Sequence, residues 1–147
     1  MSLFNLLSVS ASGMAAQRTR AEILVENMAN AETTRTSASG GGPYKRRDVI
    51  FESALQQSPF QSVLMSEMGE VSNGVRVSEV IEDGRDPDKR YIPGHPDADV
   101  EGYVAFPRMN PAEEMVDLIS ATRGYQANVS AMSAVKDMIH RSLDILR

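Results

Sequence analysis

A histidine and two aspartates in the middle of the chain are the best candidates for metal chemistry. His95, Asp97 and Asp99 stand at alternating positions, and on an extended loop their side chains could converge on a divalent cation. A small metal-dependent hydrolase is one function that this group would allow. The alternative is that Gly94, Pro96 and the aspartates shape a turn. We favour the turn, because no further histidine lies nearby to complete a ligand set.

Other charged side chains support chemistry less well. Glu113, Glu114 and Asp117 crowd the start of an expected helix, where acidic groups stabilise the helix dipole without any chemistry. His140 has no second ligand one turn away on the same helix, so we expect it at a surface or interface. The basic run 45–47 could contact RNA, but in a chain of net charge −5 we favour a solvated strand edge or a contact to an acidic neighbouring subunit.

Known catalytic patterns are missing from the sequence. It has no P-loop, nucleophile elbow or dinucleotide-binding fingerprint. We therefore predict that the protein is not an enzyme and that it has no catalytic residue, no cofactor and no metal ligand.

Composition narrows the class of protein further. The chain has 147 residues, enough for one domain, with 41% apolar residues, nine methionines and no cysteine. Its acidic balance argues against general binding to nucleic acid or to an anionic membrane. No run approaches the roughly 18 apolar residues of a membrane span, and the start of the chain is a poor secretory signal. We expect a soluble chain without membrane insertion or a cleavable leader.

Long helices are expected at both ends of the chain. Two lines of residues spaced by three and four are almost entirely apolar, and this 3.5-residue spacing is typical of coiled-coil packing. Asn110, Pro111 and Glu113 fit the cap, the first position and the capping box of the second helix. The first line comprises Leu3, Leu7, Ser10, Met14, Gln17, Ala21, Leu24, Met28 and Ala31, and the second comprises Met115, Leu118, Thr122, Tyr125, Val129, Met132, Lys136, Ile139, Leu143 and Leu146.

A small β element is expected between these helices. A Gly- and Ser-rich break covers 37–43. The dipeptides at 73–74 and 83–84 are turn signals on either side of an alternating strand pattern. The stretch 85–104 is rich in Pro, Gly and Asp and predicts an ordered loop, with a short strand around 103–105.

The predicted fold class is α+β, mainly α. Long N- and C-terminal helices pair as a coiled-coil-like hairpin, and a small antiparallel β or loop element is inserted between them. The corresponding segments are 1–34, 35–109 and 110–147.

Helix length bears on assembly. Helices over 2–30 and 111–146 would measure about 44 and 54 Å at 1.5 Å per residue, whereas a compact sphere of this chain length is about 38 Å across. We therefore expect an elongated monomer whose helix ends are covered by other chains.

Several segments carry a family resemblance. Residues 27–34 (NMANAETT) resemble the N-x-A-N-x-x-T signature of bacterial flagellar rod and hook proteins. Residues 113–132 resemble the closing helix of the same superfamily. Within it, residues 41–51 and 91–119 resemble the FlgC family of proximal rod proteins, and only the variable region 54–74 interrupts the resemblance. The closing helix carries it through Glu114, Met115, Val116, Asp117, Ile119, Arg123, Tyr125 and Asn128.

The resemblance implies a structural role. Proteins of this family build the proximal rod of the flagellar basal body, a drive shaft that transmits torque, and pair their terminal helices into a tube wall. It implies contacts with other copies of the chain, with the rod proteins FlgB, FlgF and FlgG and with the ring–rod adapter FliE. It also implies uncleaved passage through the flagellar type III export apparatus, followed by a place in the periplasmic part of the basal body.

Residues at the end of the first helix and along both apolar lines are expected at the subunit interface. Asn27 and Asn30 could hydrogen-bond across a subunit boundary and fix register, while Thr33 and Thr34 favour leaving the helix; plain helix termination is the alternative. The expected interface comprises Leu3, Leu7, Met14, Leu24, Asn27, Met28, Asn30, Thr33, Met115, Leu118, Ile119, Arg123, Tyr125, Asn128, Val129, Met132, Ile139 and Leu143.

One further class of protein fits the same apolar lines. A cytosolic coiled-coil adaptor or chaperone would also use them, and it should form a closed dimer or tetramer in solution. The assembly interpretation instead expects a monomer whose termini become ordered only with rod partners.

Overall fold

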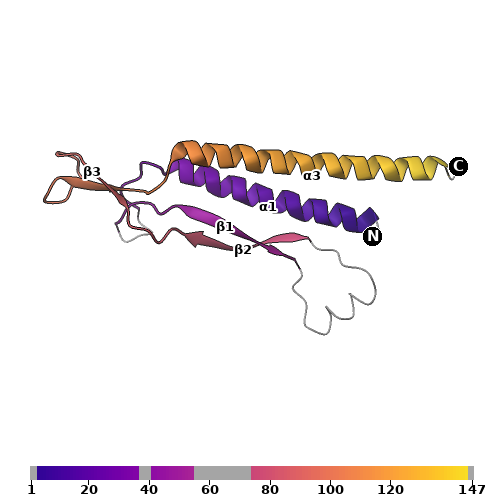
Figure 1. Ribbon diagram of the computed structural model, residues 1–147, viewed down its shortest axis with the longest axis horizontal. Coiled ribbons are helices and arrows are strands. Elements are labelled where there is room, and N and C mark those ends of the chain that lie inside the picture. The colour runs from indigo at the N-terminus through magenta and orange to yellow at the C-terminus, as the bar shows by residue number, and fades with distance from the viewer. Residues whose placement is uncertain (1–2, 37–40, 55–73, 146–147) are drawn as a thin grey trace, which may run out of the picture. The chain divides into compact units, whose positions relative to one another are not determined.

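A computed structural model describes residues 3–36, 41–54 and 74–145 (Figure 1). The predicted fold class is confirmed, because two helices enclose small antiparallel strand pairs in the sequence. The predicted conformation of most of the region 54–74 lies outside the described residues. The elements in chain order are α1 (Leu3–Ala29), β1 (Arg47–Ser53), β2 (Val75–Glu82), β3 (Asp88–Tyr91), β4 (Tyr103–Phe106) and α3 (Pro111–Ile145).

The chain divides into two compact units that each combine distant segments. The first unit contains Met1–Thr19, Ile50–Glu79 and Ser120–Arg147, and the second contains Arg20–Val49 and Val80–Ile119. The helices and the strands β1 and β2 each run from one unit into the other. The division of the sequence into 1–34, 35–109 and 110–147 stays a prediction.

Helix α1 has 27 residues and therefore a length of about 40 Å. It ends where the Asn30 amide N–H reaches back to the carbonyls of Glu26 and Asn27, each at 3.1 Å. The Asn30 side chain also donates to the Glu26 carbonyl at 2.9 Å, and the Thr33 hydroxyl donates to Asn30 Oδ1 at 3.1 Å. These local bonds satisfy backbone carbonyl groups that have no hydrogen-bond donor within the helix at its C-terminal end.

Helix α3 has 35 residues and measures about 52 Å. Its predicted start is confirmed: Asn110 Oδ1 accepts from the Ala112 N–H at 3.1 Å, and the Asn110 amide donates to Glu113 at 3.3 Å. Pro111 occupies the first helical position, where its missing N–H costs nothing. No helix in the described part of the chain is apolar enough over a sufficient length to cross a membrane.

The strands form two separate two-stranded sheets, β1 with β2 and β3 with β4. The antiparallel register of the second sheet pairs Tyr91 with Tyr103 and Asp88 with Phe106. The predicted strand around 103–105 is confirmed as β4. Strand β3 was predicted as loop, and that prediction is wrong. All four of its side chains are exposed, so it lacks the apolar alternation by which a strand is recognised, and its pairing with β4 stabilises it.

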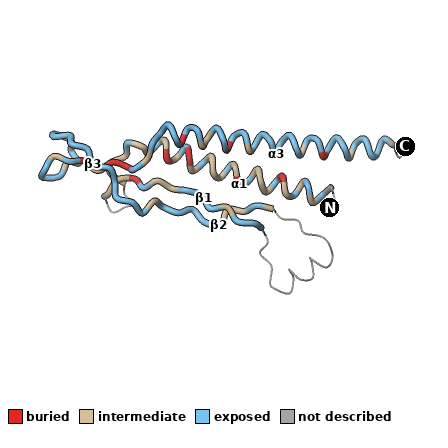
Figure 2. The backbone as a smooth tube through the Cα atoms, viewed as in Figure 1, coloured by how far each residue is buried: buried red, intermediate tan, exposed pale blue. Residues whose placement is uncertain are grey.

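In the first unit, α1 and α3 run antiparallel and close together through small residues. A Cβ atom at Gly13 would lie 2.9 Å from the Asn128 side chain, and one at Gly124 would lie 3.3 Å from Gln17. Figure 2 shows buried positions on the sides of the two helices that face each other, and Ala121 of α3 is buried. Small side chains let the two backbones approach, which increases the number of van der Waals contacts between them.

The predicted apolar line of α3 is covered only in part, and its half-buried members are Leu118, Met132 and Ile139. Met115, Tyr125, Val129 and Leu143 are all exposed. The buried positions of α3, which are Glu114, Ala121 and Val135, each lie one residue before a position of that line. On α1 the prediction holds better: Ser10 and Leu24 are buried, and Leu7, Met14, Gln17, Ala21, Met28 and Ala31 are half-buried.

Candidate assembly interface

Asn27 is the centre of a buried polar network in the second unit. Its side chain is 0% exposed. Its amide nitrogen donates to the Arg47 carbonyl at 2.8 Å and to Glu114 Oε2 at 3.0 Å. Its oxygen accepts from the Tyr44 hydroxyl and from the Arg47 N–H, both at 3.0 Å. All four hydrogen-bonding positions of the amide are thus used, and they fasten the end of α1 to β1 and α3.

Glu114 is the charged member of this network and is 2% exposed. Its Oε1 accepts from Arg46 Nε at 2.5 Å, and Arg46 also pairs with Asp48 at 3.0 Å. Burial alone would lower the pKa of Arg46, but its hydrogen bonds to Glu114 and Asp48 raise that pKa above the ordinary value. A buried carboxylate is tolerated only when it is paired and hydrogen-bonded, and Glu114 is both.

The sequence interpretation placed Glu114 among acids that stabilise a helix dipole, and it missed this buried role. Spacing along the chain gives no sign of the contact between Glu114 and Arg46, because the two residues lie 68 positions apart. The available signal was the family resemblance, in which Glu114 is one of the matched residues.

The two arginines of the basic run 45–47 contact acids of their own chain. Arg46 pairs with Glu114, and Arg47 pairs with Glu26. Arg47 also lies over the ring of Tyr44, with 5.7 Å from its guanidinium carbon to the ring centroid. The two arginines need neither the favoured contact to an acidic neighbouring subunit nor the alternative contact to RNA, because their charges are compensated within the chain.

The loop that holds His95 forms the predicted turn. His95 Nδ1 accepts from the Asp97 N–H at 3.1 Å. Asp97 accepts from the Thr34 hydroxyl at 2.7 Å and pairs with Arg35. The aspartate side chains therefore bind parts of their own loop and the segment after α1.

Asp99 completes this turn. Its Oδ1 accepts from the N–H groups of Glu101 and Tyr103 at 3.0 and 2.8 Å. Within residues 3–36, 41–54 and 74–145, no three metal-ligating side chains gather. The turn interpretation is confirmed, and the metal-dependent hydrolase finds no support in these residues.

The predicted interface residues fall into three groups by exposure. Those available at the surface of α3 are Met115, Ile119, Arg123, Tyr125, Val129 and Leu143; those half-buried are Leu7, Met14, Met28, Asn30, Thr33, Leu118, Asn128, Met132 and Ile139; and those buried are Leu24 and Asn27. The side chain of Leu3 and the residue Leu146 lie outside the described part. The contacts of Asn27 that the structure shows are internal, and His140 is exposed as expected.

An exposed apolar flank runs along α3. In the second unit it contains Met115 and Ile119, which are 55% and 48% exposed. In the first unit it contains Tyr125, Val129 and Leu143. Apolar side chains that recur at helical spacing and stay exposed are typical of a helix that packs on another molecule.

Long, closely paired terminal helices with an uncovered apolar flank are typical of a subunit that assembles with other chains. Residues 100–145 match the family model described as flagellar basal body rod FlgEFG protein C-terminal. The chain is 45% identical to the flagellar basal-body rod protein FlgC of Bacillus subtilis (strain 168) over 99% of both chains. It is 36% identical to FlgC of Borreliella burgdorferi over 100% of this chain and 99% of that one. It is 34% identical to FlgC of Salmonella typhimurium over 99% and 98%.

The chain belongs to the family of flagellar basal-body rod proteins FlgC. It is a structural subunit of the rod of the flagellar basal body, and it assembles with other copies and other rod components. Nothing in the comparisons favours a hydrolase or a cytosolic adaptor.

Proposed function

We propose that α1 and α3 form the wall of a helical tube, and that neighbouring subunits cover the apolar flank of α3. The tube would act as a drive shaft that transmits torque. In this role the chain needs no catalytic residue, and we propose that it has no enzymatic activity.

The observation that carries the proposal is the flank itself. Burying a Val, Leu or Met side chain stabilises a complex by roughly 1.5–3 kcal/mol relative to leaving it in water. Val129 and Leu143 are 40% and 58% exposed, so much of this gain is still available to a neighbour. The face of α3 that packs on α1 is separate, so one helix can hold its own chain and a second subunit together.

Contacts of this kind can propagate. When a surface of one subunit binds a different surface of the next, the contact does not close on itself, and it generates a helical filament if the rotation fails to complete a ring. A rod built this way gains stiffness from many modest contacts distributed along each helix.

The proposed neighbours are other copies of the chain, the rod proteins FlgB, FlgF and FlgG, and the adapter FliE. We propose passage through the type III export apparatus without a cleavable signal, and a final place in the periplasmic part of the rod. The lack of cysteine is compatible with transit as an unfolded chain, since no disulfide has to be broken or formed.

A charge on the flank tests the proposal. Val129→Asp should abolish rod incorporation and swimming, because assembly would bury an unpaired carboxylate. The measurement is the amount of the protein in purified basal bodies, together with motility. Ala127→Asp is the matched control: Ala127 is also exposed on α3 but lies on another side of the helix, since two residues correspond to about 200° of rotation.

Circular dichroism of both purified variants shows whether they keep their helices. Full incorporation and normal swimming with Val129→Asp would refute the proposal. Equal loss with both variants would also refute it, because the effect would then not depend on the apolar flank.

A further inference from the structure

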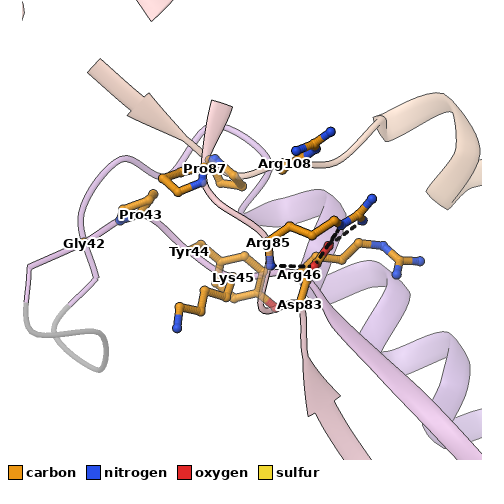
Figure 3. Close-up of a pocket in the computed structure, with 10 residues that line it drawn as sticks. Gly42, Pro43, Tyr44, Lys45, Arg46, Asp83, Arg85, Pro87 and Arg108 are labelled. Atoms are coloured by element: carbon orange, nitrogen blue, oxygen red, sulfur yellow. Dashed lines mark hydrogen bonds and ion pairs between the residues drawn. The ribbon is translucent and has the colours of Figure 1, made fainter. Parts of the chain in front are cut away.

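The second unit contains a pocket of ≈ 120 Å³ next to the basic run (Figure 3). Its walls are largely apolar and rigid, because Pro43, Pro87, Pro107 and the ring of Tyr44 line it. An apolar cavity of about 150 Å³ holds a benzene ring, so this pocket has room for a branched aliphatic group. The close-up view shows Arg108 beside Pro87, and Arg85 joined to Asp83.

The charges around this pocket are mostly positive although the chain is acidic overall. Lys45, Arg46, Arg85 and Arg108 line it with a single carboxylate, Asp83. Arg85 is occupied: its hydrogen bonds to Asp83 lower the pKa of that carboxyl to about 2.

Two of these cations remain available. Arg46 is occupied by Glu114. Lys45 and Arg108 are exposed, and neither forms a hydrogen bond or ion pair with another residue of the described ranges. The pocket therefore combines an apolar interior with cations that are free to bind an anion.

A complementary protrusion lies elsewhere in the same unit, on the turn before β4. Val100 is 106% exposed, the most exposed large apolar side chain among the described residues. The adjacent Glu101 is exposed, and its carboxylate has no partner within the described part of the chain. The turn is well defined: Asp99 accepts three bonds, from the backbone N–H groups of Glu101, Gly102 and Tyr103.

We propose that Val100 of one copy inserts into this pocket of the next copy, and that Glu101 pairs with Arg108 across the contact. This inference rests on the proposed function, in which copies of the chain contact each other in the rod. The occupant is a second copy because the chain itself supplies an exposed aliphatic group beside an unpaired carboxylate, which matches an apolar pocket beside an unpaired guanidinium. Val100 does not line the pocket, so the contact joins two different surfaces of the chain, and it can propagate from copy to copy where the rotation between copies does not close a ring.

Cross-linking between differently marked copies tests this contact directly. The chain has no cysteine, so one copy can carry Val100→Cys and a co-expressed copy Arg108→Cys without interference from its own thiols. A short bismaleimide added to purified basal bodies should then give a covalent dimer of this protein from the mixed rods, identified by mass spectrometry. Rods with Val100→Cys alone should give none, because two protrusions do not meet.

The control pair keeps the thiol chemistry but moves the first cysteine from the protrusion to another exposed position. Replacing Val100→Cys by Ser78→Cys, an exposed residue of β2 outside the pocket, should lower the dimer yield to background. A dimer yield from mixed rods that is no higher than this background would overturn the inference.

Charge reversal tests the ion pair and its polarity. Glu101→Arg and Arg108→Glu should each lower the amount of this protein in basal bodies by about threefold to fivefold, the effect expected of one ion pair at the edge of an interface. The double variant should recover most of the loss, since the pair is restored with opposite sign. A double variant no better than the worse single variant would overturn the pairing.

The two proposals fail in different ways. If Val129→Asp blocks rod formation but mixed rods give no cross-link, the flank of α3 holds the rod and the pocket contact is wrong. If the cross-link forms while Val129→Asp assembles normally, copies meet through the pocket and the proposed tube wall is wrong.

Discussion

A single asparagine holds three distant segments of the second unit together. Asn27 bonds to the backbone of Arg47, to the Tyr44 hydroxyl and to the Glu114 carboxylate. An amide suits this position because it donates on one side and accepts on the other. An aspartate there would face Glu114 with a second negative charge and would lack the donors.

Asn27→Ala should lower the free energy of unfolding by about 3 kcal/mol, because it leaves several buried groups without partners. The measurement is urea unfolding of the purified chain. Asn30→Ala is the control: within the described residues its side chain bonds to Glu26 and Thr33 nearby in the chain, so its loss should cost about 1 kcal/mol or less. Equal losses from the two variants would show that the buried network adds little stability.

The two long helices were predictable from the sequence, but the faces through which they pack on each other were not. The 3.5-residue apolar spacing and the Asn110 cap depend on neighbours within a few residues, so both helices could be predicted with nearly correct ends. Which line of α3 packs on α1 depends on how closely the backbones approach at Gly13 and Gly124. Apolarity alone favoured Met and Tyr positions that the structure leaves exposed.

The candidate site was also predicted only in part. The exposed residues of α3, among them Tyr125 and Val129, had been predicted as interface residues. The internal role of Glu114 depends on Arg46 and Asn27, and one sequence gives no measure of such long-range pairing. Strand β3 was missed because its side chains are polar and exposed, and only its bonds to β4 define it.

The turn between β3 and β4 requires a glycine. Gly102 has φ = 85°, and a Cβ there would lie 2.9 Å from the Tyr91 ring. Gly102→Ala should therefore destabilise the purified chain by about 1–2 kcal/mol in urea unfolding. Gly84→Ala is the matched control, because a Cβ at Gly84 meets nothing within 4 Å; it should leave stability unchanged within about 0.5 kcal/mol or raise it slightly. A neutral effect of Gly102→Ala would contradict the strained turn.

The two helices of the first unit differ in how far they extend. Gly13 lies beside Asn128 and Gln17 beside Gly124, and on this antiparallel register Leu3 falls opposite Met138. The last turns of α3 therefore extend past the start of α1, and helical segments without a packing partner are marginal in water.

Hydrogen exchange should reveal this difference. In the purified chain, amides of α3 beyond Met138 should exchange much faster than those around Leu24 and Asn27, which are buried. In assembled basal bodies both groups should be protected, because neighbouring subunits cover α3. Equally slow exchange at both places in the purified chain would show that the C-terminal turns need no partner, and it would remove one argument for assembly through them.

The network around Asn27 has a consequence for the order in which the protein matures. Its members come from residue 27, from the start of β1 and from residue 114, which is 87 positions from the first. In the proposed export through a narrow channel, this network can form only after residues 27 and 114 have both left the channel. Until then the Asn27 amide and the Glu114 carboxylate stay hydrated. We therefore expect binding of the chain to the growing rod and formation of the network to be completed together.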